Sequence, residues 1–513
     1  MIVSPKLFGY NLECTRHVGY GGLYAEMLQN GKFHAGTQAF YPVSFDGMEG
    51  WGQYTERLQV TAGQTYDLTA IGGEIVHIRL MTEFGTELFS CQSSHAQFTS
   101  RFTLQNIRFE AVSSDNLRYV SMRPADAFHG CRRDVLDALK ALRPGFLRVP
   151  GGCFAERYIW KDGLLPIEDR PVITDGGNHL LFSSSFGQDT HELNIDDYAA
   201  ICRYVGAEMA FTVRLSDNDP QDAADLVEYC NGDSSTPYGA LRAARGYPEP
   251  YNVKTWYIGN ELAYLSTSAL SDASHACTVN DQFVEAMRKV DSSIRTVVST
   301  GNFPDWDTAF VKAARQIDLC SHHYYLLDTH PEADLVLALR AANETTLPRL
   351  EHASSCIGHK RMCFDEWNLR WGAWGSAVSA LYAAGVTIMV LRNAERLNID
   401  CASYFAPVNE GAIRVYPDMV RLAPDGEILK RMALHANGTL CDTADECSVE
   451  TKHDGWRYHS VYNPSADNEK SILPMKGEYE LLIPLGDQLH ITSGEGVLDK
   501  LPPAAVAFIR IKA

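Results

Sequence analysis

The sequence contains no apolar run long enough to cross a membrane. Its longest apolar stretch, residues 376–391, includes Ser and Thr and falls short of the roughly 20 residues that a membrane-spanning helix needs. The N-terminus also lacks the charged region followed by an apolar segment that marks a signal peptide. We therefore expect residues 376–391 to form a buried helix and the protein to have no membrane partner.

Cysteine pairs with CxxC spacing are absent, although the chain has 13 cysteines. An odd number of scattered cysteines indicates reduced thiols, which favours a cytoplasmic location. No zinc-ligand spacing occurs, and the adjacent His322 and His323 would point to opposite faces of a strand, a poor arrangement for chelating a metal. Phosphate-binding glycine motifs are missing as well. We expect neither a metal nor another cofactor.

Positive charge is scarce: 45 Lys and Arg stand against 64 Asp and Glu, which gives a formal net charge of −19. Such a chain repels phosphates, so nucleic acids and anionic membranes are unsuitable partners, whereas a small neutral substrate is compatible. The apolar content of 45% is typical of a globular protein. A length of 513 residues exceeds what one hydrophobic core usually fills, so more than one domain is expected.

Two short segments carry recognisable chemistry. They are Tyr257-Ile258-Gly259-Asn260-Glu261 and Cys363-Phe364-Asp365-Glu366-Trp367-Asn368. Each is a β-prone apolar run interrupted by a Glu. Two carboxyl groups cleave a glycosidic bond when one protonates the leaving oxygen and the other attacks the anomeric carbon or activates water. Either segment alone would be unremarkable in so acidic a chain, but the two together favour a glycosidase.

From residue 125 onward, strand patterns alternate with helical patterns. Including residues 7–12, the predicted strands number eight, at 7–12, 146–149, 209–213, 255–258, 296–299, 318–321, 361–365 and 401–405. This rhythm predicts an α/β fold, the (β/α)₈ TIM barrel, in which functional side chains lie at the C-terminal ends of the strands. A doubly wound open sheet is the alternative, and no glycine-rich phosphate loop supports it.

Two regions depart from this rhythm and are rich in strand patterns. In the first, strands are predicted at 56–60, 75–80, 102–104 and 107–111. In the second they are predicted at 450–452, 458–462, 479–483 and 505–511. The expected organisation is therefore the start of the barrel at 1–44, a β-rich insertion at 45–124, the rest of the barrel at 125–415 and a C-terminal β-sandwich at 416–513.

An ordered series of motifs resembles glycoside hydrolase family 51. The matching segments are Leu7-Phe8-Gly9 with Glu13, Gly21-Gly22-Leu23-Tyr24-Ala25-Glu26, Phe146-Leu147-Arg148-Val149-Pro150-Gly151-Gly152-Cys153, Ile258-Gly259-Asn260-Glu261 and Asp365-Glu366-Trp367-Asn368. The family consists of retaining α-L-arabinofuranosidases built on a (β/α)₈ barrel. The order of the motifs along the chain is more specific than any one of them. The segment 119–134 is similar to the join between a carbohydrate-binding-like sandwich and the barrel, although a purely structural insert is the alternative.

The resemblance implies a role for each matching residue. Glu261 is similar to the general acid/base and Glu366 to the nucleophile of the family. Asn260 resembles the residue that binds the sugar 2-hydroxyl. Glu13 and Cys153 match positions that line the −1 subsite. The alternatives are a buried structural carboxylate for Glu13 and an inert buried thiol for Cys153.

The segment Ser321-His322-His323-Tyr324-Tyr325 is similar to the end of the sixth strand in the family. His322 and Tyr324 are predicted to contact the substrate, with the phenol of Tyr324 near the nucleophile. His323 and Tyr325 are assigned to packing.

Near the nucleophile, Asp365 is expected on the side of its strand opposite to Glu366, in a structural ion pair. Trp367 is expected in the core.

The sequence departs from the family around the sugar pocket. Residues 262–265 and 369–371 differ from the usual continuations, and the region 402–405 lacks the expected Gln-Leu-Val-Asn pattern, so one substrate contact is unassigned. We expect a retaining exo-hydrolase that releases terminal α-L-arabinofuranosyl residues from oligosaccharides. The alternatives are a hydrolase of another furanoside or of a β-glucan, or a non-catalytic carbohydrate-binding protein. The resemblance also implies a homo-oligomer.

Overall fold

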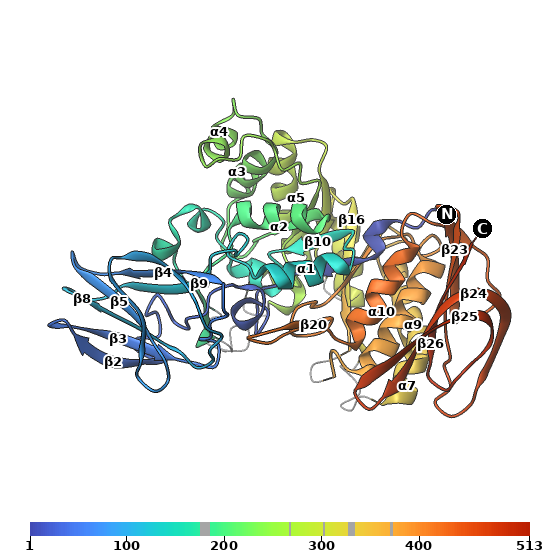
Figure 1. Cartoon of the computed structure of the whole chain (residues 1–513). Coiled ribbons are helices and arrows are strands. Elements are labelled where there is room, and N and C mark those ends of the chain that lie inside the picture. Colours follow the sequence, from blue (N-terminus) through green and yellow to red (C-terminus); the bar gives the residue numbers. More distant parts are fainter. Residues whose placement is uncertain (175–184, 266–267, 301–302, 327–333, 370–372, 513) are drawn as a thin grey trace.

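The computed structural model describes residues 1–174, 185–265, 268–300, 303–326, 334–369 and 373–512, and a closed barrel of parallel strands lies at its centre (Figure 1). The barrel strands are β1 (Gly9–Asn11), β10 (Phe146–Val149), β13 (Glu208–Val213), β14 (Thr255–Ile258), β15 (Arg295–Val298), β16 (Leu319–Tyr325), β17 (Met362–Asn368) and β18 (Ile399–Tyr404). Neighbours in the barrel follow the order of the sequence, and β18 pairs with β1 to close it. The predicted (β/α)₈ barrel is confirmed, and each of its strands overlaps a predicted one.

The lower part of the barrel interior is apolar. One inward residue from each of seven strands forms this layer: Phe146, Ala210, Tyr257, Val297, Leu319, Cys363 and Cys401. The remaining strand contributes Gly9, where a Cβ atom would lie 2.0 Å from the ring of Phe146. Glycine is required there because the ring of Phe146 occupies the space of a side chain.

Two residues further along the strands, the next inward positions are polar. Because strand residues alternate between faces, these positions also point into the barrel. The buried residues found there are Asn11, Arg148, Thr212, Ser321, Asp365 and Ser403. A polar layer therefore separates the apolar floor from the C-terminal mouth of the barrel. Its side chains lie directly beneath the residues at the strand ends.

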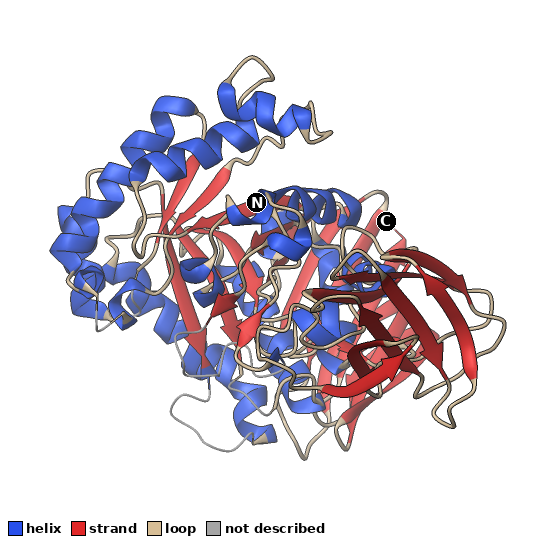
Figure 2. Ribbon diagram, turned by 90° about the vertical axis from the view of Figure 1, so that its left-hand side faces the viewer, coloured by secondary structure: helices blue, strands red, loops and turns tan. Residues whose placement is uncertain are grey.

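Helices surround the barrel strands, as Figure 2 shows from the side of the inserted sheets. They are α1 (Arg133–Ala141), α2 (Ile195–Val205), α3 (Pro220–Asn231), α4 (Pro237–Ala244), α5 (Ala273–Val290), α6 (Pro304–Ala313), α7 (Leu335–Ala341), α8 (Leu347–Cys356) and α9 (Ala377–Asn393). The predicted buried helix is α9, whose outer face is covered by α10 (Pro424–Met432) and the C-terminal strands. Covering on every side explains its uniformly apolar sequence. Among the described residues, no helix is both long enough and apolar enough to span a bilayer.

The region between β1 and α1 forms two antiparallel sheets around their own apolar core. Their strands are β2 (Phe40–Phe45), β3 (Met48–Tyr54), β4 (Thr65–Ile71), β5 (Val76–Met81), β6 (Glu87–Gln92), β7 (His95–Thr99), β8 (Arg108–Ser113) and β9 (Tyr119–Pro124). The strands predicted at 56–60 and 102–104 are wrong, since these segments share only the single bridge between Val60 and Leu104. Local turn hydrogen bonds, such as that from Leu58 N–H to the carbonyl of Thr55, replace a ladder there.

The C-terminal region is a six-stranded antiparallel sheet. Its strands are β21 (Thr439–Cys441), β22 (Ser448–His453), β23 (Trp456–Tyr462), β24 (Lys470–Leu485), β25 (Gln488–Leu501) and β26 (Val506–Lys512). The long hairpin of β24 and β25 packs back on β23 and β26, so that Met475 and Leu498 share an apolar cluster with Val461 and Ile509. This packing gives the expected sandwich character. Two short ribbons complete the described structure, β11 (Ile173–Thr174) with β12 (Gln188–Asp189) and β19 (Ile413–Val415) with β20 (Val420–Leu422).

Candidate active site

Two glutamates meet at the C-terminal mouth of the barrel. Glu261 follows β14 in a left-handed backbone conformation (φ 45°, ψ 46°), and Glu366 lies near the end of β17. One carboxylate oxygen of each, together with a ring nitrogen of His323, lie within 4.8 Å of one another. Retaining glycosidases hold their two carboxyl groups about 5–5.5 Å apart, whereas inverting enzymes leave roughly 6.5–9.5 Å. The spacing therefore suits a direct attack on the sugar by one carboxylate.

Glu366 is held by three hydrogen-bond donors. The Tyr325 hydroxyl donates to Oε1 at 2.5 Å, while Asn11 Nδ2 and Arg148 Nη1 each donate to Oε2 at 3.1 Å. Only 10% of the Glu366 side chain is exposed. Donors directed at a carboxylate favour its ionised form, so this arrangement suits a nucleophile.

His323 lies between the two glutamates. Its Nδ1 is 2.8 Å from Glu261 Oε1 and 3.5 Å from Glu366 Oε2. Burial lowers the pKa of His323, but the charge of Glu366 and the hydrogen bond to Glu261 outweigh burial and raise it to about 9. The imidazole is therefore a cation near neutral pH. Glu261, His323 and Glu366 therefore form a hydrogen-bonded charge cluster at the mouth of the barrel.

Arg148 joins Glu366 to Asn260. It is 1% exposed, and its Nη2 donates to Asn260 Oδ1 at 2.6 Å while Nη1 reaches Glu366. Its guanidinium lies 4.6 Å above the ring of Tyr257. Sequence reasoning did not identify Arg148 or Asn11. The available signal was a charged residue inside the apolar strand 146–149, on the same face as Phe146.

Glu13 binds the backbone of the turn after β10. Its two carboxylate oxygens accept hydrogen bonds from the N–H groups of Gly152 and Phe154, both at 2.9 Å. Burial, then the charge of Glu366, raise the pKa of Glu13 to about 7. A Cβ atom on Gly152 would lie 3.0–3.2 Å from oxygens of Glu13, Glu366 and Asn260. The lack of a side chain at Gly152 lets these three polar groups converge.

Cys153 and Asn260 lie beside Glu261. The exposed Cys153 thiol is 3.5 Å from Asn260 Nδ2 and 4.0 Å from Glu261 Oε2. The Asn260 N–H donates to the buried Glu156, which also accepts from the N–H of Ser216 at 2.8 Å. Glu156 thus ties together the ends of β13 and β14, and the structure brings Cys153 and Asn260 into the predicted site.

His322 and Tyr324 do not reach the site, and the prediction for them requires a correction. In β16, Leu319 belongs to the inward apolar layer, so alternation also directs Ser321, His323 and Tyr325 inward. His322 instead stacks on Phe364 with ring centroids 6.4 Å apart. Burial and the nearby Arg349 lower its pKa to about 3. The ring of Tyr324 lies 5.9 Å from the Arg349 guanidinium.

His323 and Tyr325, assigned to packing from the sequence, therefore contact the two glutamates. The error is a displacement of one residue along the strand. Counting alternate positions from Leu319 would have identified both residues.

Asp365 also faces inward, so the prediction that it points away from Glu366 is wrong. Ser321 pairs with Cys363 but His323 pairs with Glu366, which places one extra residue in β17. Such a bulge allows two consecutive side chains to face one side. Asp365 accepts from the Ser321 hydroxyl at 2.9 Å and lies 3.6 Å from His323 Nε2, in the structural ion pair that the sequence suggested.

Aromatic side chains form one wall of the site. The ring of Tyr325 stacks on Trp374 at 6.1 Å and meets Phe405, just after β18, edge-on at 5.9 Å. Trp367 is buried against Phe364 and Tyr404, as expected for a core residue. Residues 370 and 371, where the sequence departs from the family, lie outside the described residues.

Comparison with known sequences agrees with this architecture. Residues 138–336 match the family model described as alpha-L-arabinofuranosidase 1 domain. An intracellular exo-alpha-(1->5)-L-arabinofuranosidase of Acetivibrio thermocellus is 29% identical over 254 residues, covering 47% of this chain and 49% of the relative. Alpha-L-arabinofuranosidase C of Emericella nidulans is 30% identical over 271 residues, covering 48% and 52%. The chain spans about half the length of the curated relatives it matches.

Solved structures extend the likeness of fold to the whole chain. An arabinose-bound α-L-arabinofuranosidase, MgGH51, aligns with a TM-score of 0.75 at 17% identity and covers 100% of this chain and 98% of its own. An alpha-L-arabinofuranosidase from Thermotoga maritima, in its arabinose complex, aligns with a TM-score of 0.67 at 21% identity, covering 75% and 91%. The structural likeness is one of fold, and together with the match of residues 138–336 it agrees with the predicted resemblance to glycoside hydrolase family 51.

Proposed function

We propose that this chain, whose residues 138–336 belong to the alpha-L-arabinofuranosidase 1 domain family, is a retaining exo-glycoside hydrolase that releases terminal α-L-arabinofuranosyl residues. The observation that carries the proposal is the close approach of Glu261 and Glu366 beside the cationic His323. The choice of arabinose as the sugar rests on the names of the matched relatives. The substrate is a small, neutral, arabinose-containing oligosaccharide.

The reaction has two steps. Glu366 attacks the anomeric carbon while Glu261 gives its proton to the departing glycosidic oxygen, which leaves a covalent glycosyl-enzyme. Glu261, now ionised, then takes a proton from water as the water displaces Glu366 from the sugar. Each carboxyl group returns to its starting state, and two displacements retain the configuration of the anomeric carbon.

The charge of His323 interacts with the charges of both glutamates. Before the attack, the negative charge of Glu366 balances the imidazolium 3.5 Å away. Formation of the glycosyl bond removes the charge of Glu366. The imidazolium, 2.8 Å from Glu261, then stabilises the ionised acid/base that the second step requires.

The proposal also includes the cellular location, the oligomeric state and the domain boundaries of the enzyme. The first of the matched relatives is named intracellular, and all 13 cysteines of this chain are free thiols, so we place the protein in the cytoplasm. A homo-oligomer and the domain boundaries at residues 44, 124 and 415 belong to the same proposal. Asn260, Cys153 and Glu13 are the residues proposed to surround the bound arabinose.

Hydrolysis of a panel of aryl glycosides tests the proposal. The panel contains L-arabinofuranose, D-galactofuranose, D-xylose and D-glucose as the glycone, and the arabinofuranoside should be cleaved fastest, with an α-configured first product. If none of the four glycosides is cleaved, the protein is not an exo-glycosidase. Cleavage of a pyranoside alone contradicts the choice of sugar.

Variants of the two glutamates test their roles. Glu366→Ala should abolish turnover and regain it with azide, giving a glycosyl azide of inverted configuration. Glu261→Ala should retain activity on substrates with good leaving groups, because these need no proton. Glu285→Ala removes an exposed carboxylate on α5 and serves as the control. Full activity of both site variants would show that the roles are wrong.

A further inference from the structure

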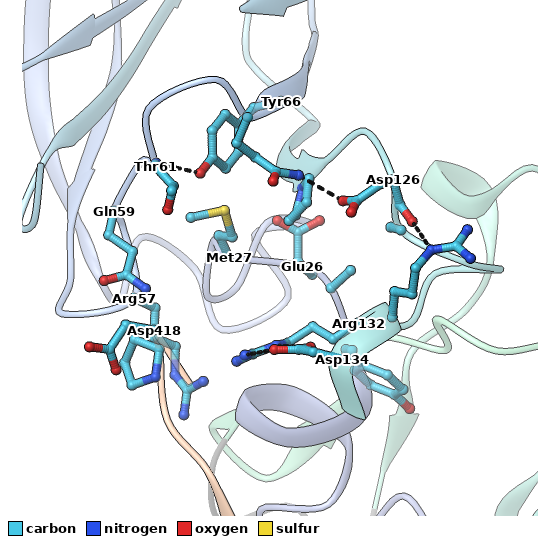
Figure 3. Close-up of a pocket in the computed structure, with 17 residues that line it drawn as sticks. Glu26, Met27, Arg57, Gln59, Thr61, Tyr66, Asp126, Arg132, Asp134 and Asp418 are labelled. Carbon is cyan, nitrogen blue, oxygen red and sulfur yellow. Dashed lines mark hydrogen bonds and ion pairs between the residues drawn. The ribbon is translucent and has the colours of Figure 1, made fainter. Parts of the chain in front are cut away.

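A polar pocket of about 290 Å³ lies between the inserted sheets and the barrel (Figure 3). Its walls come from four segments, residues 24–27, 57–66, 124–134 and 417–418. None of the residues that contact Glu261 or Glu366 lines it, so it is separate from the candidate active site. Junctions between structural units are common places for ligand sites, and the volume is near the lower end of the roughly 300–1,000 Å³ that such sites occupy.

Arg57 is held in this pocket without an anionic partner. Its guanidinium lies over the ring of Tyr20, 5.2 Å from the ring centroid. Gly21 (φ +85°) makes room for it, because a Cβ atom there would lie 2.1 Å from Arg57 Nη2. Within the described part of the chain, the guanidinium makes no hydrogen bond or ion pair. An arginine that is positioned but unpaired keeps its N–H groups available for a ligand.

Gln59 and Asp418 add further polar groups from two different segments. Figure 3 shows Gln59, Arg57 and Asp418 along one side of the pocket and the Arg132–Asp134 pair across from them. Neither the Gln59 amide nor the Asp418 carboxylate bonds to another described residue. Together the three side chains offer both donors and acceptors, as hydroxyl groups of a ligand require.

The remaining polar groups of the pocket are already paired and make its wall rigid. Glu26 accepts from Ser121 at 2.6 Å and from Arg123 at 2.9 Å. Arg132 and Asp134 form a two-point ion pair, with the shorter contact at 2.6 Å. Because the fixed charges compensate one another, the pocket presents no net field that would select an ion. Met27, Tyr66 and Pro124 supply apolar surface between the polar groups.

We propose that this pocket is a second carbohydrate site, which binds a short uncharged oligosaccharide through Arg57, Gln59 and Asp418. Hydroxyl groups of the sugar accept from Arg57 and Gln59 and donate to Asp418, while C–H faces contact the apolar surface. The ligand joins the inserted sheets to the barrel and holds a glycan on the enzyme outside the catalytic centre.

Calorimetric titration of the full chain carrying Glu366→Gln tests this proposal, because the substitution leaves the ligands uncleaved. The ligands are linear arabinotriose, xylotriose and galactotriose, with trigalacturonate as the acidic counterpart, at up to millimolar concentrations. At least one uncharged trisaccharide should bind at the pocket. Arg57→Ala and Asp418→Ala should each weaken that binding by about tenfold, as expected for the loss of a hydrogen bond to a charged group.

A matched control is available in Arg133, which borders the same pocket. Its guanidinium lies 5.7 Å from the ring of Phe128 and 5.9 Å from that of Tyr204, so Arg133→Ala should leave pocket binding unchanged. In the background with Glu366 intact, Arg57→Ala and Asp418→Ala should hydrolyse aryl glycosides at the normal rate. Thermal melting shows whether Arg57→Ala or Asp418→Ala is misfolded. If one is, Gln59→Ala takes its place in the binding experiment.

Three results would overturn the proposal. The first is that no uncharged trisaccharide binds with an affinity sensitive to Arg57→Ala and Asp418→Ala. The second is that trigalacturonate alone shows this sensitivity. The third is that Arg133→Ala weakens binding as much as the other two variants. Failure of the proposed enzymatic function appears separately, as a lack of aryl glycoside hydrolysis by the wild type.

Discussion

Replacing Tyr325 by Phe removes the hydroxyl that donates a 2.5 Å hydrogen bond to Oε1 of Glu366. The ring should keep its place, because Trp374 and Phe405 pack against it rather than against the hydroxyl alone. The variant therefore removes one of the three hydrogen-bond donors to Glu366, the proposed nucleophile. Asn11 and Arg148 continue to bind Oε2, so Glu366 remains oriented but carries a less stabilised negative charge.

The size of the effect follows from the type of bond. A hydrogen bond to a charged group contributes about 1.5–3 kcal/mol, and each 1.36 kcal/mol corresponds to tenfold in rate, so kcat/KM should fall about 10- to 150-fold. The sign of the pH effect is also determined. Loss of a donor disfavours the ionised carboxylate, so the acidic limb of the pH–rate profile should move to higher pH.

The assay is the pH dependence of kcat/KM with an aryl α-L-arabinofuranoside. Tyr324→Phe is the matched control, because Tyr324 lies on the same strand but faces Arg349 outside the barrel. Its kcat/KM should change less than about twofold, as for a substitution away from the reacting groups. Equal losses in the two variants, or an unchanged acidic limb in Tyr325→Phe, would refute the assignment of Tyr325 to the nucleophile.

Three further predictions concern the same site. Because the pKa of His323 rises from 6.5 to about 9 on folding, its stabilising contribution is complete below pH 6.5 and is lost as the pH rises towards 9. The unfolding free energy of the wild type should thus fall by about 3 kcal/mol more than that of His323→Gln across this range, measured by urea denaturation, with His322→Gln as control. Burial and the charge of Glu261 raise the pKa of the Cys153 thiol, so inactivation by iodoacetamide should be slow at pH 7 and faster at higher pH, and Cys153→Ser should be spared. Arg148→Lys cannot reach both Asn260 and Glu366, so kcat should fall roughly 100-fold and chemical denaturation should show a loss of about 3 kcal/mol.

The barrel was predictable because its signals are local. Short apolar runs mark the strands, helical spacing marks the segments between them, and their alternation admits few folds. The inserted region was harder to predict. Segments 56–60 and 102–104 have the composition of strands, but turn hydrogen bonds occupy their backbones, and these depend on neighbours that a sequence pattern does not include.

Within the site, the sequence was sufficient to identify Glu261 and Glu366, because each ends or interrupts an apolar run and each lies in a recognisable motif. It did not determine which of two adjacent residues on β16 faces inward. That choice depends on the phase of the strand, which the packing of Leu319 in the apolar layer establishes. The bulge in β17, which directs both Asp365 and Glu366 inward, likewise arises from the pairing with β16.

The local order of residues thus specified the type of fold and the identity of the two carboxyl groups. Tertiary structure alone decided the environment that surrounds them. Asn11, Arg148 and Tyr325 come from strands far apart in the chain and converge on Glu366 only because the barrel closes and brings their inward faces together. The pocket at Arg57 has the same origin, since its walls belong to segments that meet only when the inserted sheets pack on the barrel.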